Sequence, residues 1–441
     1  MSRTEPARGM RDFLPEDVRR REFVISRIRR VYERYGFEPL ETPAVENLET
    51  LLGKYGDEGN QLIFKILKRG EHEATGQADL ALRYDLTVPL ARVVAHHQAK
   101  LPRLFRRYQI QPVWRADRPA RGRFREFYQC DVDALGSTSP VVEAELCAAV
   151  AEALDELGFP DFTIRLNHRQ LLTSTLLAVG IPEPIHGTAL VAVDKLDKIG
   201  REGVKAELES RGVQSGPAAA LLHAFTPASE WPQAPPVEGL DAAGAAAFEN
   251  LQAIRRLAAG TAAGPRLVFD PSLARGLSYY TGAIMEINVA DLAGSLGGGG
   301  RYDNLVGMFL GQAIPACGFS LGLERILVVM GERGMFPASL GARPADVMMA
   351  VFDAGDIAHA LRVAGLLRTA GLRVLVYPDP DKIGKQIKYA DAQGIPCVAI
   401  LGSDEIAAGS VTIKHLAAKT QSTHDQTAAA AAILEVLNRR G

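Results

Sequence analysis

The chain has 441 residues, of which 47% are hydrophobic and 23% charged, and 50 lysines and arginines nearly balance 52 aspartates and glutamates, for a net charge of -2. At about 150 residues per domain, this length predicts two to four domains. The charge balance excludes a globally basic nucleic-acid coat protein but leaves room for a local basic groove.

The chain begins with a predicted helix and an extended segment. Pro15 and the two acids after it suit a first helical turn. Apolar residues then recur at helical spacing as far as Val31, and Gly36 is a plausible stop. Residues 37–43, which two prolines interrupt, are predicted to be extended.

The middle of the chain combines strands with a long helical stretch. Residues 162–167 alternate apolar and polar side chains, which predicts a strand. Residues from about 168 to 262 are rich in alanine and have helical patterns, so we interpret them as an inserted helical module. Strands and glycine turns return between Leu267 and Met330.

The last hundred residues predict a separate domain. Residues 333–344 are rich in glycine and proline, as a linker should be. Short apolar strands then alternate with helices: strands at 347–352, 372–377 and 397–401, helices at 356–370 and 382–393. This alternation is typical of βαβ units with a mostly parallel sheet.

The sequence disfavours a membrane protein, a secreted protein and a protein held together by disulfides. The longest apolar runs are shorter than a membrane span, and the N-terminal residues contain no apolar signal core. Cys130, Cys147, Cys317 and Cys397 are scattered and form no CxxC pair. We therefore expect no zinc site, no disulfides, no association with membranes and a cytoplasmic location.

Residues 103–125 carry a strong local excess of positive charge, with eight arginines and a single acid, Asp117. Arginine suits bidentate recognition of phosphate. A solvated surface is the ordinary explanation of a charge run. The single sign, together with interleaved residues such as Trp114 and Phe124, favours a platform for a phosphate and a base.

A strand through Gln129, Asp131 and Asp133 would place all three side chains on one face. A carboxylate and an amide beside arginines could bind an ammonium or an imidazole. The equally simple alternative is that the two aspartates only form ion pairs with those arginines.

Three further strings have uncommon compositions. Residues 273–282, LARGLSYYTG, place an arginine before a glycine and two tyrosines. The four glycines 297–300 favour a close approach of the backbone to another group, although a flexible loop or a hairpin turn is the simpler explanation. Arg325 would follow Gly322 at the head of a helix, where the positive dipole end disfavours a cation without an anionic partner.

Together these strings resemble the class II aminoacyl-tRNA synthetases, and within them the histidyl-tRNA synthetase family, over nearly the whole chain. Residues 35–46, 113–127 and 318–325 resemble the three class motifs. Four strings are similar to the histidine family itself: LRYDLTVPLAR at 82–92, RGRFREFYQCDVD at 121–133, LARGLSYYTG at 273–282 and GGRYDNLVGMF at 299–309. Residues 383–402 resemble the family's anticodon-binding domain.

The resemblance implies an α+β catalytic domain at 1–332, built on an antiparallel sheet and carrying a helical insertion at about 168–262. A linker at 333–344 would lead to a small α/β anticodon-binding domain at 345–441. It also implies a homodimer, because such enzymes place the proline of motif 1, here Pro43, at a dimer interface.

The resemblance also implies roles for individual residues. Histidine would be bound by Asp85, Thr87, Gln129, Asp133, Tyr279 and Tyr280, with Asp85 on its α-amino group and Asp133 and Tyr280 on its imidazole. ATP would be bound by Arg115 at the α-phosphate, Arg325 at the γ-phosphate, Phe127 against adenine, and by Asp117 and Arg123. Arg275 would be the catalytic cation that bridges the carboxylate and the α-phosphate.

The implied reaction ligates histidine to its tRNA through a histidyl-adenylate formed from ATP, which Mg²⁺ would accompany. Positioning and charge stabilisation suffice for both steps, so we predict neither a protein nucleophile nor protein ligands for a metal. One departure bears on Arg275, because the family usually has aspartate where this chain has Ser278.

Two alternatives remain. The chain could be a non-catalytic synthetase-like paralogue that acts as a regulatory subunit in histidine biosynthesis; such chains lack the anticodon domain and key site residues. It could also be a tRNA-binding or sensing module without chemistry, which would need no intact ATP site.

Overall fold

The structure, a computed structural model, describes residues 4–54, 56–70, 75–193, 195–226, 230–274, 279–340 and 343–438. The chain divides into two units, Met1–Phe336 and Pro337–Gly441. Within the described part, no helix combines the length and apolar character needed to cross a membrane.

Helix α1, Pro15–Arg34, begins and ends close to the predicted positions. Proline occupies its first position and two acids its first turn, which suits the positive end of the helix dipole. Val24, Ile28 and Val31 are completely buried on one face, as their spacing predicts. Gly36 then adopts a left-handed conformation (φ 73°), which a residue with a Cβ adopts only with strain, and the helix ends.

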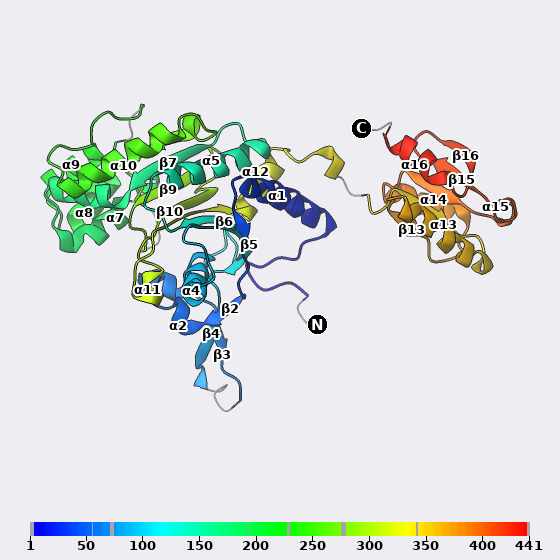
Figure 1. Ribbon diagram of the computed structural model, residues 1–441, viewed down its shortest axis with the longest axis horizontal. Coiled ribbons are helices and arrows are strands. Elements are labelled where there is room, and N and C mark those ends of the chain that lie inside the picture. The colour runs from blue at the N-terminus through cyan, green and yellow to red at the C-terminus, as the bar shows by residue number, and fades with distance from the viewer. Residues whose placement is uncertain are drawn as a thin grey trace. The chain divides into compact units, whose positions relative to one another are not determined.

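An eight-stranded sheet of the described residues organises unit 1, in the order β1-β5-β6-β11-β10-β9-β7-β8 (Figure 1). Its neighbouring strands are antiparallel except for the two outer pairs, β1–β5 and β7–β8. The strands are β1 (Glu38–Pro39), β5 (Phe105–Trp114), β6 (Glu126–Leu135), β7 (Thr163–His168), β8 (Leu267–Phe269), β9 (Ala283–Asn288), β10 (Gly297–Arg301) and β11 (Ala316–Gly322). The α+β architecture predicted for the catalytic domain is confirmed.

One face of this sheet is apolar and covered by helices. Its side chains, such as Val132, Met285 and Phe319, belong to the largest hydrophobic core. The covering helices are α1, α5 (Val141–Glu156), α10 (Ala242–Ala258) and α12 (Leu323–Glu332). Because side chains alternate along a strand, the intervening residues point to the opposite face.

Smaller elements surround that opposite face. A three-stranded antiparallel sheet has the order β2-β4-β3. Its strands and the short helices near it are β2 (Val45–Asn47), α2 (Leu48–Leu51), α3 (Gly56–Gln61), β3 (Lys65–Leu67), β4 (Ala78–Leu82), α4 (Thr87–His97) and α11 (Gly307–Leu310).

The helices predicted at 168–262 divide between two hydrophobic cores. A second core, which includes Leu190, Leu208 and Phe225, is formed mainly by α6 (Arg169–Ala178), α7 (His186–Val193), α8 (Leu196–Ser210) and α9 (Ser215–Ala224). Helix α10 instead contributes Phe248 and Leu251 to the core under the main sheet. The sequence could not show which core each helix packs against, because an amphipathic helix has the same residue pattern in either case.

Unit 2 contains a sheet with the order β13-β12-β14-β15-β16, in which the first three strands are parallel and the last two antiparallel. The predicted strands and helices are present: β12 (Val347–Ala350), α13 (Ile357–Thr369), β13 (Val374–Val376), α14 (Ile383–Ala392) and β14 (Cys397–Ile400). The sequence analysis did not predict α15 (Ser403–Ala408), β15 (Ser410–His415), β16 (Thr420–Asp425) and α16 (Ala429–Asn438).

Candidate active site

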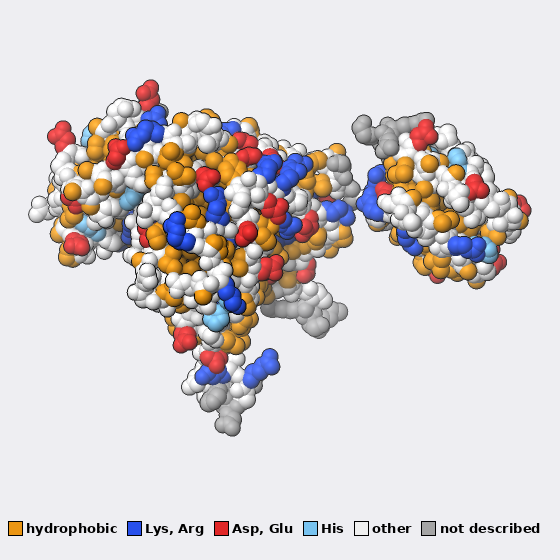
Figure 2. Space-filling view, in the orientation of Figure 1, with side chains coloured by type: hydrophobic (Ala, Val, Ile, Leu, Met, Phe, Trp, Pro, Cys, Tyr) orange, Lys and Arg blue, Asp and Glu red, His pale blue; other side chains and the backbone are white. Residues whose placement is uncertain are grey.

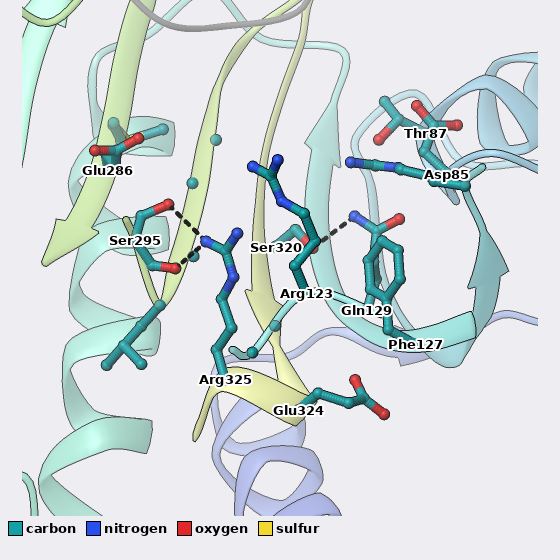
Figure 3. Close-up of a pocket in the computed structure, with 18 of the residues that line it drawn as sticks. Asp85, Thr87, Arg123, Phe127, Gln129, Glu286, Ser295, Ser320, Glu324 and Arg325 are labelled. Atoms are coloured by element: carbon teal, nitrogen blue, oxygen red, sulfur yellow. Dashed lines mark hydrogen bonds between the residues drawn. The ribbon is translucent and has the colours of Figure 1, made fainter. Parts of the chain in front are cut away.

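A cavity of about 560 Å³ lies on the face of the eight-stranded sheet opposite its helices. Strand register explains how its floor is assembled. Glu286 on β9 pairs with Gly298 on β10, which pairs with Ser320 on β11, which pairs with Asp131 on β6. One row of directly paired residues therefore crosses four strands on the cavity face, and Figure 3 shows Glu286 and Ser320 among the lining side chains.

Glycines keep this floor open. Gly298 lies in the row just described, where a side chain would project toward the cavity. In the next row, an added Cβ at Gly318 would overlap Asp133 Oδ1, and one at Gly300 would lie 3.0 Å from the Tyr280 ring. The four-glycine run is thus part of a strand and not a loop or turn, and it permits the close approach that its composition suggested.

Ten of the twelve residues predicted for the site line this one cavity: Asp85, Thr87, Arg115, Asp117, Arg123, Phe127, Gln129, Tyr279, Tyr280 and Arg325. Asp133 is buried four residues along β6 from Gln129 and is not among the lining residues. Arg275, like Ser278, lies outside the described residues.

Polar groups at one end of the cavity come from the segment that leads into α4 and from β6. Asp85 Oδ1 accepts a hydrogen bond of 3.0 Å from the Val88 N–H, and its Oδ2 lies 3.4 Å from the Tyr279 hydroxyl. Gln129 Nε2 donates to Ser320 Oγ at 2.9 Å, as Figure 3 shows, which leaves its carbonyl oxygen available as an acceptor. This end therefore offers carboxylate and amide oxygens to a ligand that carries N–H groups.

Beside the cavity, two buried aspartates form ion pairs with one arginine. Arg107 Nη2 lies 2.8 Å from Asp133 Oδ2 and 3.9 Å from Asp131 Oδ2, and each side chain is at most 3% exposed. Tyr302 donates a hydrogen bond to Asp133. Burial raises the pKa of both carboxyls, that of Asp131 to about 7, although Arg107 opposes the shift. The ion pairs considered as the alternative for these aspartates are therefore present.

The eight arginines of 103–125 do not form one anion site. Arg115 and Arg123 line the cavity. Others bind within the protein: Arg103 to Gly136 O, Arg106 to Glu145, Arg107 to the aspartates, Arg121 to Glu332 and Arg125 to Asp117 O. The charge run thus consists mainly of structural contacts, and two of its members line the cavity.

Cationic and aromatic side chains form another wall. The Arg115 guanidinium lies 5.2 Å from the centre of the Phe127 ring. The Arg123 guanidinium forms no hydrogen bond or ion pair with the described residues, and Figure 3 shows it extending between Arg325 and Gln129. Arg325 stands in the first turn of α12, as predicted, and donates to Ser295. Several guanidiniums in one cavity favour a polyanionic ligand.

The lining residues that the sequence analysis missed include Glu286, Ser320 and Glu324. Glu324 accepts hydrogen bonds of 2.8 Å from Arg21 of α1 and from the Tyr128 N–H. Glu286 had a usable signal, since it is the single acid in the apolar strand 283–287. Ser320 had none, because its position depends on the register between strands.

Metal ligands are sparse around this cavity. The described residues include no group of three or more His, Cys, Asp and Glu side chains that could hold a metal ion. The carboxylates that line the cavity are Asp85, Asp117, Glu286 and Glu324.

Comparisons with known proteins agree with this geometry. A model of the histidyl-tRNA synthetase family matches residues 9–326, and one of an anticodon binding domain matches residues 347–436. The histidine–tRNA ligase of Cytophaga hutchinsonii is 40% identical over 437 residues, covering 94% of this chain and 96% of that protein. That of Gloeobacter violaceus is 42% identical over 459 residues, covering 94% of each. The crystal structure of histidyl-tRNA synthetase from Nostoc sp. PCC 7120 is 31% identical, with a TM-score of 0.79, and the match covers 99% of this chain and 100% of that one.

Proposed function

The chain belongs to the histidyl-tRNA synthetase family, and from this membership we propose how its cavity activates histidine. The protein is a histidine–tRNA ligase. The regulatory-subunit alternative is disfavoured, because curated ligases match the chain over nearly its whole length, including the anticodon-binding unit. A sensing module without chemistry is disfavoured as well, since it would not need the arginines that line the cavity.

One observation carries the proposal: a single cavity joins oxygen acceptors to a set of arginines and an aromatic ring. Histidine would bind with its α-amino group at Asp85 and Thr87 and its side chain toward Gln129 and Tyr280, with Tyr279 and Asp133 supporting them. ATP would bind with adenine on Phe127 and its phosphates near Arg115, Arg123 and Arg325, with Asp117 close by. These roles match the chemistry of each group, because guanidiniums bind phosphates and carboxylates bind ammonium groups.

In the first step, a histidine carboxylate oxygen would attack the α-phosphorus of ATP, and pyrophosphate would leave. Arg115 and Arg123 would stabilise the charge that develops on the phosphate oxygens. Arg275 would bridge the two reactants, a role that rests on the sequence. In the second step, the terminal adenosine hydroxyl of the tRNA would attack the acyl carbon, and AMP would leave. The protein contributes positioning and charge stabilisation to both steps.

Magnesium would arrive with ATP. The lining residues fit an ion held mainly by phosphates and water, because Glu286 and Glu324 offer carboxylates without forming a complete ligand set. When bound, the ion would neutralise charge on the phosphates. Glu324 would offer its carboxylate to the ion in the orientation that the hydrogen bond from Arg21 fixes.

The remaining partners follow from the other parts of the chain. Residues 345–441 would bind the anticodon of the histidine tRNA, consistent with the family model matched there. Residues 35–46 would form a homodimer interface. A cytoplasmic location is supported by the buried cysteines, none of which forms a disulfide among the described residues: Cys130, Cys147, Cys317 and Cys397.

The test measures ATP–pyrophosphate exchange with each of the twenty amino acids, and we expect exchange with histidine alone. Gln129→Ala should raise KM for histidine roughly tenfold or more, because a buried hydrogen-bonding group is lost, and should leave KM for ATP unchanged. Phe127→Ala should raise KM for ATP and leave KM for histidine unchanged, because adenine loses the ring on which it stacks.

Arg121→Ala is the matched control. It removes an exposed arginine from the segment before β6, and this arginine pairs with Glu332 outside the cavity. It should leave both KM values unchanged. Exchange with several amino acids would contradict the assignment of histidine. A parallel rise of both KM values in each variant would contradict the division of the cavity into two parts.

A further inference from the structure

Arg107 is a buried cation that the reaction described above does not use. It lies on β5 directly opposite Asp133 on β6, and its side chain is 0% exposed. Besides its ion pairs with Asp133 and Asp131, its guanidinium donates hydrogen bonds to Gln109 Oε1 at 3.3 Å and to the Leu86 carbonyl oxygen at 3.2 Å. Its position is therefore fixed from several sides, and it does not line the cavity.

Negative charge exceeds positive charge in the cluster formed by Arg107, Asp131 and Asp133. One guanidinium stands within 4 Å of two carboxylates, so the three side chains together carry one excess negative charge when all are ionised. Asp131 Oδ1 and Gln129 Oε1 are buried oxygens that accept no hydrogen bond from the described residues. Buried acceptors without donors are costly. Gln129 lines the cavity, so its oxygen favours a ligand that brings N–H groups, whereas Asp131 lies on the same strand but is not among the lining residues.

The surroundings supply little other positive charge. Arg83 acts on Asp131 at longer range, but its guanidinium donates to the backbone carbonyls of Thr42 and Pro112. The remaining titratable and polar groups that face the two carboxyls are neutral or negative: Tyr32, Asp85, Tyr280, Tyr302, Cys317 and Ser320. Among the described residues, Arg107 is thus the cation in direct contact with both aspartates.

We propose that Arg107 is a positioning residue that limits the protonation of Asp131 and Asp133 and fixes their orientation beside the cavity, where their negative charge favours the N–H groups of histidine. This inference rests on the proposed function of the cavity. Without the guanidinium, the buried carboxyls would take up protons at higher pH. A protonated carboxyl carries no negative charge, so the cavity would attract the N–H groups of histidine less strongly at neutral and acid pH.

The experiment compares the wild type with Arg107→Met and Arg107→Lys in the full chain, using calorimetric titration with histidine and KM from pyrophosphate exchange over a range of pH around 7. Arg107→Met should raise KM for histidine roughly tenfold or more at neutral pH while KM for ATP stays unchanged. The pH below which histidine binding weakens should rise by about one unit or more, and Arg107→Lys should lie closer to the wild type. Free histidine itself titrates in this pH range. Because this titration is the same for every variant, it does not affect the differences between them.

Arg301→Met is the matched control. Arg301 is also a buried arginine paired with a buried carboxylate, Glu143 at 2.6 Å, but neither residue lines the cavity. The control should lower the melting temperature without moving the pH dependence of histidine binding. If Arg107→Met fails to fold, the double variant Arg107→Met/Asp131→Asn leaves one buried carboxylate in the cluster instead of two, and it should still bind histidine more weakly than Asp131→Asn alone.

Two outcomes would overturn the inference. In the first, folded Arg107 variants show the wild-type pH dependence and KM for histidine. In the second, Arg301→Met shifts the pH dependence as much as Arg107→Met does, which would indicate a general effect on stability. Failure of the proposed function would look different, because the wild type itself would then not bind histidine.

Discussion

Asp131 makes a contribution to stability that depends on pH. Burial raises the pKa of its carboxyl from an ordinary 3.8 to about 7, although Arg107 opposes the shift. The folded chain therefore holds this proton more tightly than the unfolded chain, so the contribution is complete below about pH 4 and is lost as pH rises through about 7. Asp131→Asn, which cannot ionise, should raise the free energy of unfolding at about pH 8 by on the order of 1 kcal/mol, and little at about pH 4.

Urea unfolding at the two pH values checks this prediction. Asp291→Asn is a control of opposite sign, because Arg333 lowers the pKa of the exposed Asp291 carboxyl. Its stabilising contribution is present above the unfolded pKa and is lost as pH falls, so this variant should lose stability at neutral pH. An equal effect of Asp131→Asn at both pH values would refute the argument.

The residue scale also shows where sequence reasoning stops. The spacing of Gln129, Asp131 and Asp133 predicts their common face, but not that Gln129 reaches the cavity while Asp133 is buried against Arg107. How deeply each of these side chains is buried depends on the neighbouring strands, and no local sequence pattern reveals it. Ser320 is informative only once β11 is paired with β6.

Strand β10 has two faces with different requirements. An added Cβ at Gly298 would project toward the cavity and meet only Met285 O, at 3.2 Å. One at Gly299 would overlap the Gly318 carbonyl and lie 2.7 Å from Phe319 Cα, and neither backbone atom can move cheaply. We therefore expect Gly299→Ala to destabilise the protein by about 1–3 kcal/mol, as overpacking does, and Gly298→Ala to fold normally but raise KM for substrate.

Thermal melting and exchange kinetics on the two variants separate these effects. The pair is well matched, because each change adds one methyl group to adjacent positions of the same strand. Equal melting temperatures for the two variants would contradict the difference between the faces.

Sequence patterns predict elements well where one face of an element is buried. Strands β12, β13 and β14 are short and apolar, and their predicted ranges include the observed ones. Strand β16, with the sequence TQSTHD, is almost entirely exposed and has no apolar alternation to reveal it. The strand forms because β15 provides a partner, which is a property of the folded unit.

The whole chain consists of two units with separate hydrophobic cores. The cavity belongs to unit 1, so a chain of residues 1–336 should keep histidine-dependent pyrophosphate exchange. It should aminoacylate tRNA less efficiently by roughly 100-fold or more, because the second contact with the tRNA is lost. Aminoacylation and exchange assays on the truncated chain test this. Loss of exchange with the unit still folded would show that activation depends on residues 337–441.

The row of paired residues from Glu286 to Asp131 restricts how this enzyme can evolve. Adding or deleting one residue within β6, β10 or β11 would turn every later side chain of that strand to the other face. Asp131 or Ser320 would then enter the apolar core, and apolar residues would enter the cavity. Changes of chain length are therefore tolerated only between these strands, and new amino-acid specificities must arise by replacing side chains at fixed positions.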